Sequence, residues 1–163
     1  YDDEVICGNT RPKIEGVVGT SLNWKGLSLS LNFRYQLGAD VFNEALFNKV
    51  ENISTEGLNK NQDKRALYER WQKAGDIVRF KNIANAASTP MSSRFVQEEN
   101  VLTLESVYLG YEFYDGWIQK LGLSNLKLQV SMRDVFRASS IKSERGISYP
   151  FARSLEAGLS FNF

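Results

Sequence analysis

Apolar and polar side chains alternate without a break from Leu27 to Leu37, which is typical of a β-strand with one apolar and one polar face. The same period of two returns, less strictly, in three other stretches. Lys25-Gly26 follows the first of them, and glycine there suits a two-residue hairpin turn. The alternation predicts strands at about 13–24, 27–38, 124–135 and 152–163.

A fifth strand, at about 101–113, contains a change of phase. Leu102 and Leu104 share one phase of the alternation, whereas Val107, Leu109 and the apolar residues that follow take the opposite one. One irregular residue reverses the face to which the following side chains point. We therefore expect a β-bulge near Glu105-Ser106.

A polar insertion of unusual length, residues 39–100, separates the second and third strands. We expect it to contain two short helices, because two groups of apolar residues have helical spacing. The first group is Val41, Phe42, Ala45, Leu46 and Val50, and the second is Ala66, Leu67, Tyr68 and Trp71.

Strand length and connections favour a transmembrane β-barrel over a soluble sandwich, which would show the same alternation with its apolar face inward. Strands of about ten residues suit a bilayer crossing. The connections at 25–26 and 114–123 are short, while those at 39–100 and 137–150 are long. Short periplasmic turns and long extracellular loops characterise such barrels. The fold class is therefore all-β and antiparallel, with a long, partly helical extracellular loop.

Aromatic residues lie near the strand ends that this orientation places on the periplasmic side. An aromatic girdle at the inner membrane interface has this distribution, although aromatics are also common at the margins of ordinary sheets. The residues are Trp24, Phe113, Tyr114, Trp117 and Phe163.

The amino-acid composition argues against several classes of function. Twenty basic and nineteen acidic residues give a net charge of +1, without the basic excess that nucleic-acid binding requires. The chain has no histidine, so it lacks the usual general base of a nucleophile triad and the commonest metal ligand. Its single cysteine, Cys7, excludes an internal disulfide and a cysteine-based zinc site. We expect no enzyme activity, no cofactor and no metal site.

Several motifs, in a fixed order over nearly the whole chain, resemble those of SusC/RagA-type TonB-dependent transporters. Gly8-Asn9-Thr10-Arg11-Pro12-Lys13 is similar to that family's G-N-x-x-P-K, and Ser21 to Ser30 is similar to its S-x-x-Y/W-K-G-F/L-x-L-S. Further matches are Arg70 to Asp76, Ser93 to Val96, Leu102 to Tyr111, Asp134-Val135-Phe136 and Tyr149 to Ser154. The departures are Ala74 in place of proline, Asp134 in place of asparagine, and a shortened loop before Tyr149.

The resemblance implies that residues 1–163 are the C-terminal five strands of a 22-stranded, plugged barrel in the outer membrane of a Gram-negative bacterium. It implies import of oligosaccharides or peptides. The energy would come from the TonB-ExbB-ExbD complex, acting through an N-terminal part that is missing here, and a SusD-like surface lipoprotein would form the lid. The strand count agrees, since five strands cannot close a membrane barrel whose smallest examples have eight.

Three groups of residues are candidates for function. Phe161 and Phe163 resemble the terminal signal read by the barrel-assembly machinery, although they also suit plain contact with lipid. Tyr68, Arg70 and Trp71 would contact sugar or the lid, or would instead pack the loop. Asn32, Arg34, Gln129 and Arg133 would line the ligand cavity, or would form a solvated wall.

Three other functions stay open on the sequence. A siderophore or vitamin receptor lies within the same transporter class. A soluble β-rich glycan-binding module would bury the apolar faces internally. A small β-barrel adhesin would need strands that the sequence does not contain.

Overall fold

The computed structural model describes residues 4–114, 116–142 and 153–163. The chain divides into two compact units. We call the described residues of Pro12–Gly38, Asn100–Ser140 and Arg145–Phe163 the sheet unit, and those of Tyr1–Arg11, Ala39–Glu99 and Ile141–Glu144 the loop unit.

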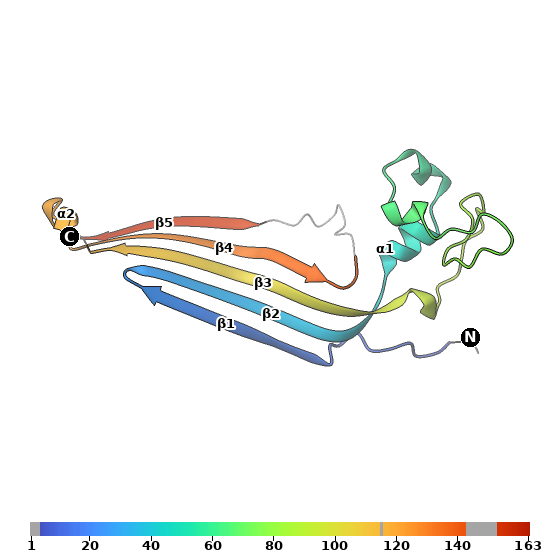
Figure 1. The fold of residues 1–163 in the computed structure, drawn as a ribbon, viewed down its shortest axis with the longest axis horizontal. Helices are drawn as coiled ribbons and strands as arrows, with labels where there is room; N and C mark the ends of the chain where they lie inside the picture. The colour runs from blue at the N-terminus through green and yellow to red at the C-terminus, as the bar shows by residue number, and fades with distance from the viewer. Residues whose placement is uncertain (1–3, 115, 143–152) are drawn as a thin grey trace. The chain divides into compact units, whose positions relative to one another are not determined.

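Five strands form one sheet in the order β1-β2-β3-β4-β5, so every strand pairs with its neighbour in the sequence (Figure 1). This confirms the predicted five-stranded antiparallel sheet. The strands are β1 (Ile14–Trp24), β2 (Leu27–Phe42), β3 (Val96–Phe113), β4 (Asn125–Ser139) and β5 (Ser154–Asn162).

The turn between β1 and β2 has the predicted two residues. Lys25 has φ 46° and Gly26 has φ 86°, the left-handed conformation that a tight hairpin of this kind uses. Trp24 pairs with Leu27, and the register continues without a shift to Ile14 opposite Leu37. Gly26 also accepts a hydrogen bond from the backbone N–H of Glu112 at 2.8 Å, which joins this hairpin to β3.

The predicted irregularity of β3 is confirmed. The pairing of β3 with β4 shifts between Leu104 and Ser106, and Asp134 on the partner strand has φ 51°. Asn32 and Arg34 of β2 hydrogen-bond to Ser106 and Glu105 respectively, so these consecutive β3 residues reach side chains on one face of β2. A regular strand would direct them to opposite faces.

β2 and β3 are longer than predicted at the ends that adjoin the insertion. Val41 and Phe42 belong to β2 and not to a helix, so that part of the helix prediction is wrong. The strands stay paired there, because the backbone N–H of Asn43 donates to the carbonyl of Phe95 at 2.8 Å. Pairing between the strand ends satisfies backbone groups. In the first turn of a helix, the backbone N–H groups would have no partner within the helix.

Helical structure in the insertion is shorter than predicted. α1 (Glu44–Leu46) begins at Asn43, whose side chain accepts the backbone N–H of Leu46 at 3.0 Å, and it continues as a π-helical turn, Phe47–Glu51. The second predicted helix is only a 3-10 turn, Lys64–Leu67. The remaining elements are 3-10 turns at Thr55–Asn59 and Ser93–Phe95, and α2 (Gly116–Lys120) in the sheet unit.

The loop unit has its own apolar core. Leu46, Val50, Phe80 and Phe95 are buried together, with Phe42 and Phe47 packed against them. The rings of Phe42, Phe47 and Phe95 meet edge to face, with centroids 5.1–6.0 Å apart. No helix among the described residues is long and apolar enough to cross a membrane.

Candidate functional site

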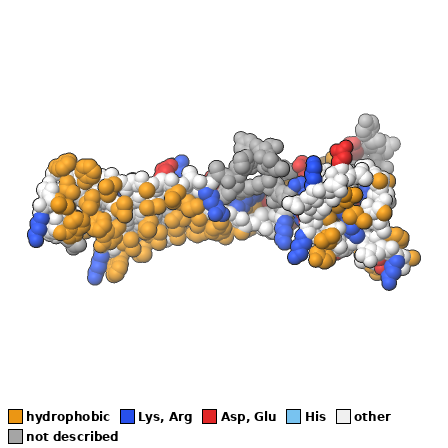
Figure 2. Space-filling model, turned by 90° about the horizontal axis from the view of Figure 1, so that it is seen from above, with side chains coloured by type: hydrophobic (Ala, Val, Ile, Leu, Met, Phe, Trp, Pro, Cys, Tyr) orange, Lys and Arg blue, Asp and Glu red, His pale blue; other side chains and the backbone are white. Residues whose placement is uncertain are grey.

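One face of the sheet unit is apolar and uncovered by the described residues. Cross-strand pairs on this face include Val18 with Phe33, Leu22 with Leu29, and Leu128 with Leu159. Leu22 is 56% exposed and Leu159 is 61% exposed. Figure 2 shows the hydrophobic side chains as a continuous band over the strands. A soluble monomer rarely exposes an apolar surface of this extent.

The opposite face carries the four predicted wall residues. Asn32 pairs with Gly19, and Arg34 with Val17, across β1 and β2. Gln129 pairs with Gly110 and with Gly158, and Arg133 pairs with Ser106 and with Ser154. The register therefore places all four side chains on the face that points away from Phe33, Leu128 and Leu159.

Neighbouring strands share polar contacts on this second face. Asn32 donates to the hydroxyl of Ser106 at 2.9 Å, and Arg34 forms an ion pair with Glu105. The hydroxyl of Tyr108 donates to Gln129 at 3.2 Å. The face is thus a hydrogen-bonded polar surface in which Arg34, Gln129 and Arg133 remain exposed.

Aromatic rings gather at the end of the sheet that holds the Lys25-Gly26 turn. Phe113 packs edge to face against Trp117 at 5.9 Å, and Phe161 packs in the same way against Phe163 at 5.6 Å. The register joins these groups, because Leu126 pairs with both Phe113 and Phe161. The predicted girdle residues are therefore brought together at one margin of the sheet unit.

The three loop candidates have different surroundings. Tyr68 is 58% exposed and Trp71 is 43% exposed, whereas Arg70 between them is buried. The Arg70 guanidinium donates to the carbonyls of Ala66 at 2.6 Å, Lys81 at 3.0 Å, and Val50. Burial lowers the pKa of this guanidinium, and the nearby Glu51 carboxylate acts in the opposite direction. Arg70 is engaged inside the loop unit, with exposed rings on either side of it in the sequence.

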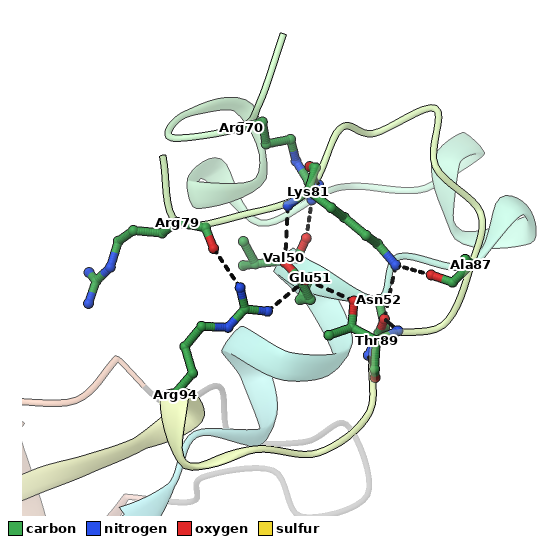
Figure 3. Close-up of polar contacts among 9 residues, drawn as sticks. All are labelled: Val50, Glu51, Asn52, Arg70, Arg79, Lys81, Ala87, Thr89 and Arg94. Carbon is green, nitrogen blue, oxygen red and sulfur yellow. Dashed lines mark hydrogen bonds and ion pairs between the residues drawn. The ribbon is translucent and has the colours of Figure 1, made fainter. Parts of the chain in front are cut away.

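Glu51 is a buried acid that the sequence did not single out. Its carboxylate accepts from the Thr89 hydroxyl at 2.8 Å, from Arg94 at 2.7 Å and from the backbone N–H of Lys81 at 3.4 Å (Figure 3). Burial by itself raises the pKa of Glu51, but the hydrogen bonds from Thr89 and Arg94 outweigh it and the pKa lies below its ordinary value. Its partners are 30 to 43 positions away in the chain, so no local pattern could have revealed the contact.

Among the residues that the structure describes, no three His, Cys, Asp or Glu side chains come together in an arrangement able to hold a metal ion. Cys7 is exposed.

An antiparallel sheet with an uncovered apolar face, a polar face and an aromatic margin has the architecture of part of a transmembrane barrel wall. Comparison with known proteins shows which proteins the chain is similar to. The chain is 24% identical over 139 residues to TonB-dependent receptor P39 of Formosa agariphila, a match covering 83% of this chain and 13% of the relative. No family model matches the chain.

Solved structures agree on the fold. The chain is similar to the RagAB peptide importer in its open-open state, with TM-score 0.66 and 19% identity. It is also similar to the closed-closed state, with TM-score 0.64 and 20% identity. Both matches cover 85% of this chain and 15% of the solved chain. The resemblance to TonB-dependent transporters of the SusC/RagA type is thereby confirmed, and the chain spans 13–15% of the length of these relatives. Neither of these two proteins is named as an enzyme.

Proposed function

We propose that this chain forms the C-terminal five strands of a 22-stranded TonB-dependent transporter in the outer membrane of a Gram-negative bacterium. The observation that carries the proposal is the two-faced sheet. Its apolar face, with Leu22, Leu128 and Leu159 exposed, suits hydrocarbon, and its polar face suits a water-filled lumen. The similarity to TonB-dependent receptor P39 supports the same proposal.

The cargo we propose is a peptide or an oligosaccharide, taken up beneath a SusD-like lipoprotein lid with energy from the TonB-ExbB-ExbD complex. The likeness to the RagAB peptide importer supports a large cargo of this kind. Asn32, Arg34, Gln129 and Arg133 would face the cargo from the barrel wall. Tyr68 and Trp71, whose rings are exposed, would contact cargo or lid, while Arg70 would hold the segment that carries them.

A growth assay tests this function. The gene for the full-length protein is deleted, and growth is compared on peptide mixtures, on defined oligosaccharides, on limiting iron with siderophores and on limiting vitamin B12. We expect growth to be lost on one peptide or oligosaccharide source, to be restored by the intact gene, and to be unchanged on the siderophore and vitamin media. Loss confined to siderophore or vitamin uptake would replace the proposed cargo with one of those ligands.

A further inference from the structure

Residues 80–94, which we call the strap, cross the loop unit with little regular structure of their own. The strap starts at Phe80, buried in the apolar core, and ends at Arg94, next to buried Phe95. Within it, one backbone hydrogen bond joins Asn85 to Asn82 at 3.0 Å. A segment of this kind depends on contacts with the rest of the unit to keep its position.

Two adjacent residues at the end of the helical segment supply contacts along the strap. Its start is also held by the preceding segment, because Phe80 exchanges backbone hydrogen bonds with Glu69 and Trp71, and Arg70 donates to the Lys81 carbonyl. Glu51 binds the strap near its start through the backbone of Lys81, near its middle through Thr89, and at its end through Arg94. Asn52 adds a reciprocal pair with the Thr89 backbone, at 2.8 and 3.0 Å, and accepts from the Lys81 ammonium at 3.1 Å. Figure 3 shows these strap groups converging on Glu51 and Asn52.

The charges around Glu51 make its ionised form essential to this arrangement. Arg94, from the strap, and Arg70, from the segment that precedes it, are the cations that interact with the carboxylate. The Lys81 ammonium is directed to Asn52 and to the carbonyl of Ala87. The Glu51 side chain is 2% exposed and that of Arg94 is 46% exposed, so the acid is the buried centre and Arg94 reaches it from the surface. Loss of the acid's charge leaves these cations without their central partner and weakens every bond that the carboxylate accepts.

We propose that the strap opens as a unit and that the Glu51 carboxylate is the latch that keeps it closed. Closure fixes the positions of two exposed apolar side chains that the strap carries, Ile83 at 52% and Met91 at 70% exposure. It also keeps Phe80 in the apolar core. The latch is inferred from contacts within the loop unit, and it does not depend on which cargo the protein transports.

The latch has a defined dependence on pH. Because the folded-state pKa of Glu51 lies below the ordinary value of 4.5, ionisation stabilises the closed strap above that value. The stabilisation is lost as the pH falls through the lowered pKa. The strap is therefore closed at neutral pH and opens in acid.

Hydrogen exchange measured by mass spectrometry on the full-length protein in detergent tests the latch. In Glu51→Gln, peptides from residues 80–94 should exchange about 10- to 100-fold faster at neutral pH, and their acid-induced opening, corrected for intrinsic rates, should disappear. Peptides from β1 and β4 should not change. The matched control is Glu56→Gln, which alters an exposed acid of the same unit.

A second variant tests the latch if the Glu51→Gln protein cannot be produced in a folded form. Arg94→Gln should accelerate exchange of the strap by a smaller factor, because Thr89 and the Lys81 backbone still bind the carboxylate. Unchanged exchange of residues 80–94 in these variants would overturn the latch. Acceleration spread evenly over the sheet peptides, or equally large in Glu56→Gln, would overturn it as well.

Discussion

Gly26 occupies a site that excludes any side chain, for two separate reasons. Its φ of 86° is left-handed, and a Cβ atom there would overlap the carbonyl oxygen of Glu112. Gly122 shares the first reason, with φ 75°, but has open space where its Cβ would be. Comparing substitutions at the two glycines therefore distinguishes the effect of backbone strain from the effect of steric overlap.

We expect Gly26→Ala to destabilise the full-length protein by about 2–3 kcal/mol and Gly122→Ala by about 1 kcal/mol. The difference arises because only the first substitution pushes the hairpin away from β3. The measurement is the midpoint of urea unfolding of the full-length protein, followed by heat-modifiable migration in gels. Equal losses in the two variants would mean that the contact between Gly26 and Glu112 does not constrain the hairpin.

Arg70 illustrates what the sequence could not establish at this scale. Its place between Tyr68 and Trp71 favours a binding surface, and nothing in the neighbouring residues indicates that its guanidinium is directed inward. The carbonyls that it binds belong to Val50, Ala66 and Lys81, which the fold alone brings together. Glu51 was missed for the same reason. Short-range sequence patterns indicate which residues share one face of a strand or helix. Buried polar networks instead depend on contacts between residues that are distant in the sequence.

At the scale of elements, the strands were the most predictable feature, because period-two alternation reports directly which residues share a face. The phase change at Glu105-Ser106 was also sufficient to place the bulge. The strand ends were not predictable, since β2 continues through Val41 and Phe42, whose apolar side chains suit a helix equally well. Pairing with β3 makes these two residues part of a strand.

The last strand carries a prediction of its own. Phe163 packs on Phe161 and is 87% exposed, so it contributes little to the packing of the described residues. If Phe161 and Phe163 form an assembly signal, deleting Phe163 should lower the outer-membrane level of the full-length protein several-fold. Asn162→Ala, which alters the adjacent residue on the polar face, is the control. Immunoblots of membrane fractions that show wild-type levels after the deletion would reject the signal.

At the scale of the whole molecule, a barrel wall and a soluble module differ in what lies against each face of the sheet. A soluble module would cover the apolar face with protein, and among the described residues nothing does so. A barrel wall would place that face in lipid and the face with Asn32, Arg34, Gln129 and Arg133 in water. The two alternatives differ in what surrounds Leu128 and Leu159, which the chain by itself leaves exposed.

Spin labels placed one at a time along β4, from Leu126 to Met132, test this most directly. The full-length protein is first freed of its native cysteines, Cys7→Ser among them, and is reconstituted in lipid vesicles. Each label is then probed with oxygen and with a water-soluble nickel complex. We predict that oxygen, which concentrates in the bilayer, relaxes the labels at 126, 128, 130 and 132 most strongly, and that the nickel complex relaxes those at 127, 129 and 131. Uniform access along the strand, or nickel access at the even positions, would contradict the barrel wall.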